Sequence, residues 1–565
     1  MKSNPPSVII VGAGAGGIAT AARLAKRGYQ VTVVEKNDAV GGRCSLIEEN
    51  NYRFDRGPSL LLMPEYFEEV FAALDTTLAA EGVELLKCDP TYRIYYADAS
   101  PPLDLSTDMA AMQSVIQAHE GRSGWERFLQ FLVEAGRHYN LSRQHVLYSN
   151  YPHAWSIVKP GMVRNIFRLH PFTSVYARAA QYLQSERLRQ AFTFASMYLG
   201  MNPFEAPGTY SLLQYAELVY GVWYPRGGFR RVLDAIHAIS TRHGATYRLN
   251  TPVSHITLSA DQKTATGVQL TTGETLTADT VIINADLIYA YTHLLPPTAY
   301  STSLTKRETS CSSISFFWSF NTTLPALECH NVFLASEYKE SFDAIFHDKH
   351  LPRDPSFYIH VPSRVDPTAA PAGCDALVVL VPVGNLAPSP SAPDTAAAKS
   401  RPEYWDAIVT QLRETILTTI ESRTGMPSLR SHLIHEKLET PLTWREKFNL
   451  DRGAILGLSH SFFNVLGFRP KVRHPDIKSL FFVGASTHPG TGVPVCLAGS
   501  RIVSREVVRD FEGGRGWDAS GWGGAGGLGL GLVVPVLVLV LVAGLMGVWV
   551  VGWVWGWPVC FLWFR

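Results

Sequence analysis

The sequence predicts an α/β protein with a discontinuous Rossmann-type nucleotide-binding domain, an inserted substrate domain of mixed sheet plus helices, and a C-terminal transmembrane segment. Two glycine-rich turns, each between an apolar strand and a helix, predict the nucleotide-binding part. The first turn lies within residues 7–35 and the second within residues 480–494. An apolar run without charged side chains, residues 532–555, predicts the membrane segment.

The charge of the chain is balanced, since 50 Lys+Arg face 49 Asp+Glu and the formal net charge is +1. Proteins that bind nucleic acid cluster cationic side chains to neutralise phosphates, so this balance argues against a nucleic-acid partner. Charged residues make up only 18% and hydrophobic ones 46% of the 565 residues. The mean hydropathy of +0.03 lies at the upper edge of the globular range, which indicates that the average hides one very apolar segment. The length predicts several domains.

Seven cysteines are scattered along the chain without a Cys-x-x-Cys pair: Cys44, Cys88, Cys311, Cys329, Cys374, Cys496 and Cys560. An odd number without a pairing pattern indicates a reducing compartment and argues against a disulfide framework or a structural zinc site. The first residues also lack the basic and apolar regions of a signal peptide. We therefore expect the catalytic part to face the cytosol, and the oligomeric state stays open.

The first nucleotide-binding signal is a strand, residues 7–11, that runs into a glycine turn and then into a helix, residues 18–28. The turn supplies four candidate cofactor-binding glycines: Gly12, Gly14, Gly16 and Gly17. Gly12 makes the tight turn, Gly14 lets the backbone approach a pyrophosphate, and Gly17 permits close packing of helix on strand. The phosphates are expected at the positive end of the helix.

A second strand, residues 29–34, ends in Glu35, whose carboxylate is placed to accept the hydroxyls of an adenosine ribose. A glycine fingerprint alone is weak evidence, because glycine-rich loops also arise by chance. Here strand, turn, helix, strand and acid follow one another in the required order within residues 7–35, which favours a dinucleotide site.

A further group after the second strand bears on which dinucleotide is bound. Lys36 follows the acid, and Gly41, Gly42 and Arg43 can bring backbone and a guanidinium against the same pyrophosphate. A flavin that is held permanently needs such additional contacts, whereas a nicotinamide dehydrogenase does not. The alternatives are an ordinary turn with a surface arginine, and NAD as the less favoured dinucleotide.

Four stretches of the chain resemble amine-oxidase-type flavoproteins, and more closely the phytoene desaturases of bacteria and fungi. They are residues 8–43 with 55–59, residues 223–229, residues 251–256 with 266–286, and residues 480–494. The resemblance covers residues 8–508 and does not depend on the tail. It implies FAD as the cofactor, and it places Val253 beside the cofactor in one of the returning strands.

The last of these stretches, Leu-Phe-Phe-Val-Gly-Ala-Ser-Thr-His-Pro-Gly-Thr-Gly-Val-Pro, is the most specific. Its strand runs into glycines and then into a helix that begins near Pro494, so unpaired N–H groups face the turn and can stabilise a reduced isoalloxazine. The predicted flavin contacts are Gly484, Thr487, Gly492, Val493 and Pro494. Ala485 stands where many relatives have an acid, so the backbone and Thr487 would have to replace it. His488 is a candidate acid or base, with shaping of the turn as the alternative.

The resemblance implies a membrane-associated phytoene desaturase, an oxidoreductase acting on CH–CH groups. It would introduce double bonds into a long apolar polyene, passing a hydride to flavin and yielding lycopene-type or more desaturated carotenes in carotenoid biosynthesis. The final electron acceptor would be oxygen or a quinone. The alternatives are another flavin oxidoreductase with an amine, porphyrinogen or retinoid substrate, and a non-catalytic membrane-tethered nucleotide-binding protein.

The order of the signals divides the chain into interleaved parts. We expect residues 1–87, 221–299 and 441–510 to form the FAD-binding domain, residues 88–220 and 300–440 the substrate domain, residues 511–531 a Gly-rich tether and residues 532–555 the transmembrane segment. Strand-rich passages at residues 312–320 and 376–383 predict a sheet in the substrate domain, and aromatic residues between positions 109 and 220 predict its core. Some of these aromatics should line a polyene tunnel.

The tail predicts a lipid bilayer as a partner, because its apolar run exceeds the roughly 20 residues that cross a bilayer core. A single span and a hairpin broken at Pro535 or Pro558 are both compatible with the sequence. The pairs His347-x-x-His350 and His432-x-x-His435 have helical metal-ligand spacing but no third partner, so we expect surface histidines and no metal.

Overall fold

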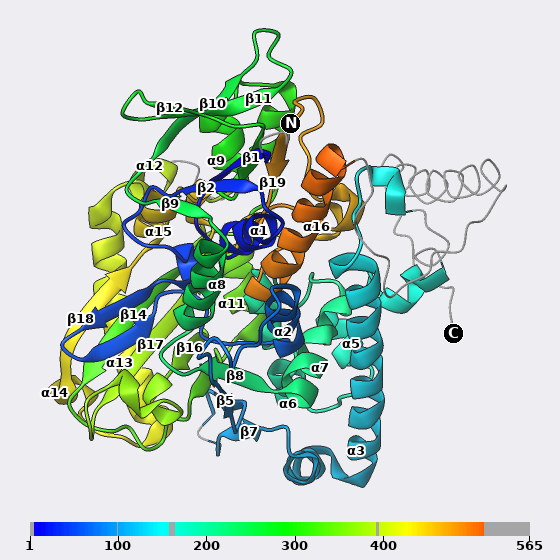
Figure 1. The fold of residues 1–565 in the computed structure, drawn as a ribbon. Coiled ribbons are helices and arrows are strands. Elements are labelled where there is room, and N and C mark those ends of the chain that lie inside the picture. Colours follow the sequence, from blue (N-terminus) through cyan, green and yellow to red (C-terminus); the bar gives the residue numbers. More distant parts are fainter. Residues whose placement is uncertain (1–4, 99, 158–163, 391–394, 513–565) are drawn as a thin grey trace.

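The computed structural model describes residues 5–98, 100–157, 164–390 and 395–512 (Figure 1). At its centre is a five-stranded sheet in which every neighbouring pair is parallel. In spatial order its strands are β19 (Leu480–Phe482), β13 (Thr280–Ile283), β1 (Ser7–Val11), β2 (Gln30–Val34) and β9 (Thr246–Arg248). Strands from the beginning, the middle and the end of the chain thus lie side by side.

Three helices pack near this sheet, and α1 (Ala15–Lys26) lies between α8 (Arg230–Arg242) and α16 (Val493–Glu512). Helix α1 begins three residues before the predicted residue 18. Gly16 and Gly17 disfavour a helix there, but Gly14 caps the helix with extended backbone, so the helical turn begins at Ala15, inside the glycine fingerprint. Small residues such as Ala19 and Ala22, both completely buried, let the three helices approach.

A seven-stranded mixed sheet forms the second layer, at the lower left of Figure 1. Its order is β18 (Leu433–Glu439), β14 (Ser312–Phe320), β17 (Asp375–Val383), β16 (Phe357–His360), β15 (His330–Phe333), β6 (Tyr92–Tyr95) and β7 (Leu103–Leu105). Only β15 and β6 pair in parallel; the other neighbours are antiparallel.

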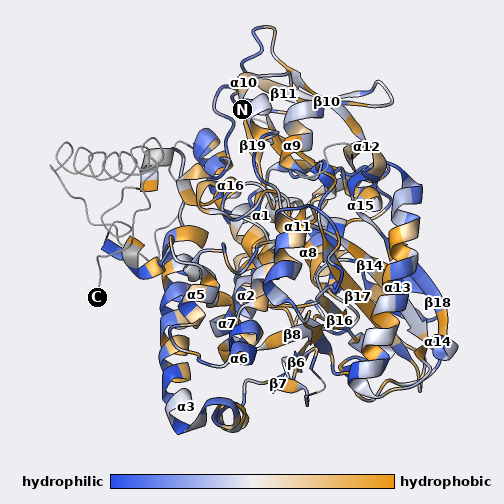
Figure 2. Ribbon diagram, turned by 180° about the vertical axis from the view of Figure 1, so that it is seen from behind, coloured by the Kyte–Doolittle hydropathy of each residue, from blue (hydrophilic) through white to orange (hydrophobic). Residues whose placement is uncertain are grey.

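Helices and a hairpin cover both faces of the mixed sheet, so its central strands consist mainly of apolar residues. All nine residues of β14 are buried. Phe316 and Trp318 pack toward α13 (Pro402–Thr424), whereas Phe317 packs against Phe54 of the hairpin β3 (Leu46–Glu49) and β4 (Tyr52–Asp55). In Figure 2, α13 alternates between hydrophobic and hydrophilic turns, as a helix with one packed face does.

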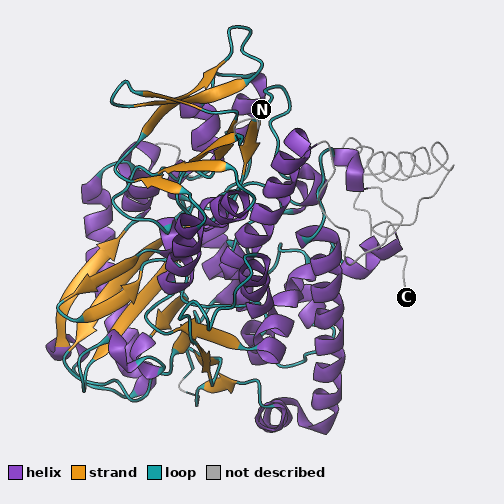
Figure 3. Ribbon diagram, in the orientation of Figure 1, coloured by secondary structure: helices purple, strands orange, loops and turns teal. Residues whose placement is uncertain are grey.

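The remaining elements surround these two sheets (Figure 3). A three-stranded antiparallel sheet joins β10 (Val253–Leu258), β11 (Ala265–Leu270) and β12 (Thr275–Thr277), and β5 (Leu85–Cys88) pairs with β8 (Val222–Pro225). The other helices are α2 (Pro64–Ala73), α3 (Met109–Ser142), α5 (Val175–Ala179), α6 (Glu186–Ala191), α7 (Leu212–Tyr215), α9 (Leu287–Tyr289), α10 (Ala299–Leu304), α11 (Tyr338–Phe346), α12 (Thr395–Lys399), α14 (Leu429–His432) and α15 (Pro441–Phe448).

The predicted α/β class, with a parallel sheet and a mixed sheet, is confirmed. Within the described ranges, no helix is both long and apolar enough to cross a membrane. The predicted tether falls outside those ranges except for residues 511 and 512, and the predicted span, residues 532–555, lies outside them entirely. The domain boundaries stay a prediction. The predicted aromatic core is confirmed for Phe128, Phe131, Phe192 and Phe194, which are buried in one cluster.

Candidate flavin site and its surroundings

The glycine turn after β1 has no room for side chains. Gly12 takes the left-handed conformation at φ +101°, and an ideal Cβ on Gly17 would lie 2.2 Å from the carbonyl oxygen of Gly12. The N-cap Gly14 makes no side-chain capping bond, and the first turn of α1 carries no acid. The positive end of α1 is therefore available to an anion, which fits the pyrophosphate of a dinucleotide.

Asn284, directly after β13, lies over this turn and was not singled out by the sequence. Its Nδ2 donates to the Gly12 carbonyl at 3.1 Å. A Cβ on Gly14 would lie 2.9 Å from the same Nδ2, and one on Gly16 would lie 2.9 Å from Oδ1. Asn284 thus joins the first and second of the stretches that predict nucleotide binding. Its only signal in the sequence is its position at the end of a parallel strand.

Glu35 is where the sequence places it, at the end of β2 and beside the turn. Its Oε2 accepts from the Ala13 N–H at 2.8 Å and its Oε1 from the Asn37 N–H at 2.9 Å. The Thr251 N–H donates to the Glu35 carbonyl at 2.7 Å, which brings the segment containing Val253 to the same edge of the sheet. This carboxylate can therefore hold a ribose beside the glycine turn.

The second glycine pair packs on the first turn. The Gly41 N–H donates to the Ala13 carbonyl at 2.8 Å, and a Cβ on Gly42 would lie 3.4 Å from the Cα of Gly14. The Arg43 guanidinium donates to the Ile455 carbonyl. The two glycine segments thus form one wall, as the predicted pyrophosphate site requires, while the guanidinium is bonded to the third stretch of chain.

The turn after β19 closes the site from the other side. A Cβ on Gly484 would lie 3.2 Å from Asn284 Oδ1, and one on Gly16 would lie 3.5 Å from the Gly484 nitrogen. The Thr487 N–H donates to the Gly484 carbonyl at 3.1 Å. The other predicted contacts of this stretch, Gly492, Val493 and Pro494, lie at the start of α16, whose first residue is Val493.

Two predicted site residues have other partners in the structure. Lys36 Nζ donates to the Glu446 carbonyl at 2.7 Å and to Asn449 Oδ1 at 2.8 Å, so it fastens the loop after β2 to α15. The His488 ring nitrogen Nε2 lies 2.7 Å from the Ser149 carbonyl, and the ring meets Tyr151 edge-on. This geometry favours the turn-shaping role of His488; the cofactor contact of Lys36 and the catalytic role of His488 stay predictions.

Arg469 is a second residue that the sequence did not indicate. Its side chain is completely buried, and burial lowers its pKa to about 10, so it stays charged at neutral pH. Its guanidinium donates to five main-chain carbonyls, those of Leu458, Ser459, Asn464, Ala485 and Thr487. Two of these belong to the flavin-site turn, so Arg469 fixes the backbone of that turn.

Asp55 anchors the segment that continues from the second glycine pair. Its Oδ2 accepts from the Tyr224 hydroxyl and its Oδ1 from the Phe229 N–H, each at 2.7 Å. Burial raises the pKa of Asp55 to about 6 despite these bonds. Two residues on, a Cβ at Gly57 would lie 2.3 Å from the Arg43 carbonyl oxygen, so this segment packs directly on the wall of the site.

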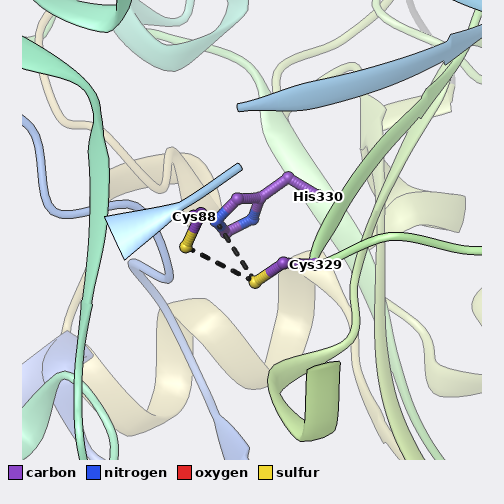
Figure 4. A group of neighbouring side chains, drawn as sticks. All are labelled: Cys88, Cys329 and His330. Atoms are coloured by element: carbon purple, nitrogen blue, oxygen red, sulfur yellow. Dashed lines mark hydrogen bonds between the residues drawn. The ribbon is translucent and has the colours of Figure 1, made fainter. Parts of the chain in front are cut away.

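Three buried side chains in the substrate region have the composition of a metal site: Cys88, Cys329 and His330 (Figure 4). The two sulfurs lie 3.6 Å apart, and Cys329 Sγ lies 3.6 Å from His330 Nε2. Burial raises the pKa of Cys329 well above its usual value, which favours a neutral thiol. A structural zinc site needs four ligands, and this group supplies three, so we assign no metal to it.

The second such group, Glu134, His138 and His170, is already bonded. The His138 ring nitrogens lie 2.8 Å from Ser211 Oγ and 2.9 Å from a main-chain carbonyl, and Glu134 pairs with Arg178. Side chains with these partners are not free to bind a cation. The histidines of the first spaced pair, His347 and His350, are half exposed, as expected.

The sequence pattern of the family described as flavin containing amine oxidoreductase matches residues 15–508. The chain belongs to that family. Within it, the chain is 52% identical over 517 residues to the phytoene desaturase of Fusarium fujikuroi, with 90% of each chain covered. It is 51% identical to that of Neurospora crassa, covering 90% of this chain and 85% of the relative, and it is thus of the fungal phytoene-desaturase type.

Solved structures confirm the fold of the family. A putrescine oxidase aligns with a TM-score of 0.60 over 90% of this chain and 99% of its own, at 14% identity. An oxidoreductase from Methanosarcina mazei aligns with a TM-score of 0.58 over 88% of this chain and 99% of its own, at 16% identity. Membership of a flavin-containing family agrees with the glycine turns and with the position of Glu35 beside the first of them.

Substitution of Glu35 by glutamine is expected to weaken flavin binding about 10-fold to 100-fold, because hydrogen bonds to a charged group contribute roughly 1.5–3 kcal/mol. The amide keeps the size of the side chain but offers one acceptor where Glu35 uses two, toward Ala13 and Asn37. Titration of the apoprotein with FAD, followed by flavin fluorescence, measures the change. Glu48→Gln, at an exposed position of the neighbouring strand β3, is the matched control; equal affinities of the two variants would contradict the assignment.

Proposed function

We propose that the protein is an FAD-dependent phytoene desaturase that introduces double bonds into phytoene during carotenoid biosynthesis, giving lycopene-type or more desaturated carotenes. The observation that carries this proposal is the identity of about half of all positions to fungal phytoene desaturases over 90% of the chain. The convergence of three distant stretches on one glycine-lined site supports FAD, rather than NAD, as the dinucleotide.

When bound, FAD supplies the acceptor for the hydride that leaves the substrate. The chain's own part is to hold and to position. Glu35 and the α1 N-terminus bind the ribose and the pyrophosphate, and the turn after β19, braced by Arg469, offers N–H groups to negative charge on the ring. The aromatic cluster between α3 and the mixed sheet would exclude water from an apolar chain bound there.

We further propose that the apolar run at residues 532–555 attaches the enzyme to a bilayer, as a single span or a hairpin, with the catalytic part on the cytosolic side. Phytoene has no charged group and dissolves in lipid, so a membrane attachment shortens its path to the site. Oxygen or a quinone is the proposed final electron acceptor. Deleting residues 513–565 should then reduce the fraction of protein that floats with liposomes.

The test of the function is conversion of phytoene in liposomes by the purified full-length chain with an electron acceptor. The expected result is bound FAD in the visible spectrum and products that absorb at longer wavelengths than phytoene. FAD-loaded protein that forms no more-conjugated product would overturn the proposal and favour an amine, porphyrinogen or retinoid substrate. Protein without flavin absorbance would favour a non-catalytic nucleotide-binding role.

A further inference from the structure

We propose that Glu217 is a catalytic residue that accepts the proton lost from the substrate in each desaturation step. This inference rests on the proposed function and deepens it. Glu217 lies in a π-helical turn, residues Ala216–Tyr220, that follows α7. Such turns are frequent at functional sites because they displace one side chain from the regular helical row.

Glu217 is a buried acid without a cation. Its side chain is 2% exposed, and its Oε1 accepts from the Tyr92 hydroxyl at 3.1 Å. Other buried acids of the substrate region are ion-paired: Glu134 with Arg178, Asp366 with Arg53, and Asp375 with Arg364. Among the described residues, the interactions that act on the Glu217 carboxyl are its burial and the Tyr92 hydrogen bond, with no cation. Burial of a carboxylate that has one hydrogen bond and no cation costs free energy, which points to a role in chemistry.

Glu217 is surrounded by apolar and aromatic side chains. Tyr92 meets Phe194 edge-on at 5.4 Å and lies 6.4 Å from the ring of Tyr198. The Tyr198 hydroxyl is also buried and interacts with the Tyr92 hydroxyl. Leu218 belongs to the same aromatic cluster, which also holds Phe128. The acid is thus enclosed by aromatic and aliphatic side chains and shielded from bulk water.

Polar side chains lie between this acid and the flavin site. Ser59 follows the segment that packs on Arg43, and its Oγ lies 2.8 Å from the Tyr358 hydroxyl. That hydroxyl lies 2.7 Å from His330 Nδ1, and the His330 ring, drawn in Figure 4, lies 6.0 Å from the ring of Tyr92. The Tyr92 hydroxyl then reaches Glu217. Hydrogen bonds thus join Ser59, Tyr358 and His330, and a ring contact brings His330 beside the tyrosine that bonds to the acid.

The reaction balances with Glu217 as the base. One C–H bond of the CH2–CH2 unit breaks with its electron pair, and the hydride leaves for the oxidant that the proposed function supplies. On the adjacent carbon the C–H bond gives its electron pair to the new C=C bond, and its proton goes to a carboxylate oxygen of Glu217. Desolvation makes this carboxylate a stronger base than it would be in water, since burial raises its pKa to about 8.

The titratable groups that face Glu217 are Tyr92 from β6 and Tyr198 from the turn Phe194–Leu199. Burial raises the pKa of both phenols well above 10, so neither titrates near neutral pH. In the wild type kcat/KM is therefore expected to rise with pH toward a plateau above about pH 8, as the carboxyl loses its proton. In Glu217→Gln we expect kcat to fall about 100-fold or more and this rise to disappear.

Stability gives a readout that is independent of activity. Because the fold raises the pKa of Glu217 from 4.5 to about 8, its contribution to stability is present below pH 4.5 and is lost as the pH rises through 8. The Glu217→Gln variant has no ionisable group at this position. The difference between its melting temperature and that of the wild type should therefore shift in favour of the variant as the pH rises from 4.5 to 8. A constant difference would mean that Glu217 does not titrate as proposed.

Glu134→Gln is the control, since it removes another buried carboxylate of the same region that already has a cation, Arg178. It should keep the rise of kcat/KM with pH. All variants must show the flavin spectrum of the wild type. A Glu217→Gln enzyme that keeps both kcat and the pH profile of the wild type would overturn the inference. A flavin-loaded wild type that leaves phytoene unchanged would instead overturn the proposed function. In that case the melting temperatures would still decide whether Glu217 titrates.

Discussion

Gly17→Ala is expected to yield protein purified without flavin. The added Cβ would lie 2.2 Å from the main-chain oxygen of Gly12, and neither partner is a flexible side chain that can turn away. The first turn of α1 must therefore move away from the strand by about 1 Å, and misplacements of that size cost roughly 100-fold where geometry is fixed. The N–H groups that bind the pyrophosphate move with it.

The ratio of flavin absorbance to protein absorbance measures this loss, and a thermal melt shows whether the apoprotein is folded. Gly28→Ala is the matched control at the other end of the same helix. Gly28 also has a positive φ, +86°, but a Cβ there meets nothing within 4 Å, so this variant should lose some stability and keep its flavin. Full flavin content in Gly17→Ala would contradict the placement of the pyrophosphate on this turn.

The part of the site around Gly12 and Glu35 was predictable because all its determinants are local. Strand, turn, helix, strand and acid lie within residues 7–35, and each step follows from backbone geometry. The early start of α1 was missed because helix propensity penalises glycine, whereas here the close approach of Gly17 to the Gly12 carbonyl and of Gly16 to Asn284 leaves no room for a side chain.

Asn284 was not predictable, because its meaning depends on contacts far apart in sequence. Its neighbours Gly12 and Gly484 lie about 270 and 200 positions away, and only the assembled parallel sheet brings them together. The same holds for Cys88 and Cys329, which are 241 residues apart and show no spacing pattern. The long apolar strands β14 and β17 were foreseen from their runs of buried residues, whereas the short strands β6, β7 and β15 carry too little periodicity to be recognised.

Glu217 was also invisible to sequence reasoning. A single acid between Ala216 and Leu218 reads as an exposed position of a helix, since acids are rarely buried without a cation. The structure reverses that interpretation, because Glu217 lies in a π-helical turn and two tyrosines, one from β6 and one from the turn after α6, pack around it. The most informative residues of this chain are therefore those at which the local pattern and the tertiary environment disagree.

Arg469→Met is expected to destabilise the protein by about 3–5 kcal/mol and to release the flavin, because the methionine fills part of the volume but leaves five buried carbonyls without a donor. Two of them, at Ala485 and Thr487, belong to the turn that offers N–H groups to the flavin, so cofactor loss should accompany the fall in melting temperature.

Arg469→Lys separates the charge from the geometry. Lysine keeps a cation, but its single ammonium cannot reach the carbonyls of Asn464 and Thr487 at once, whereas the planar guanidinium donates to both. The lysine variant should thus fall between the wild type and Arg469→Met in both melting temperature and flavin content. If Arg469→Lys has the melting temperature and flavin content of the wild type, a positive charge alone is sufficient. The proposed role of the several guanidinium hydrogen bonds would then be wrong.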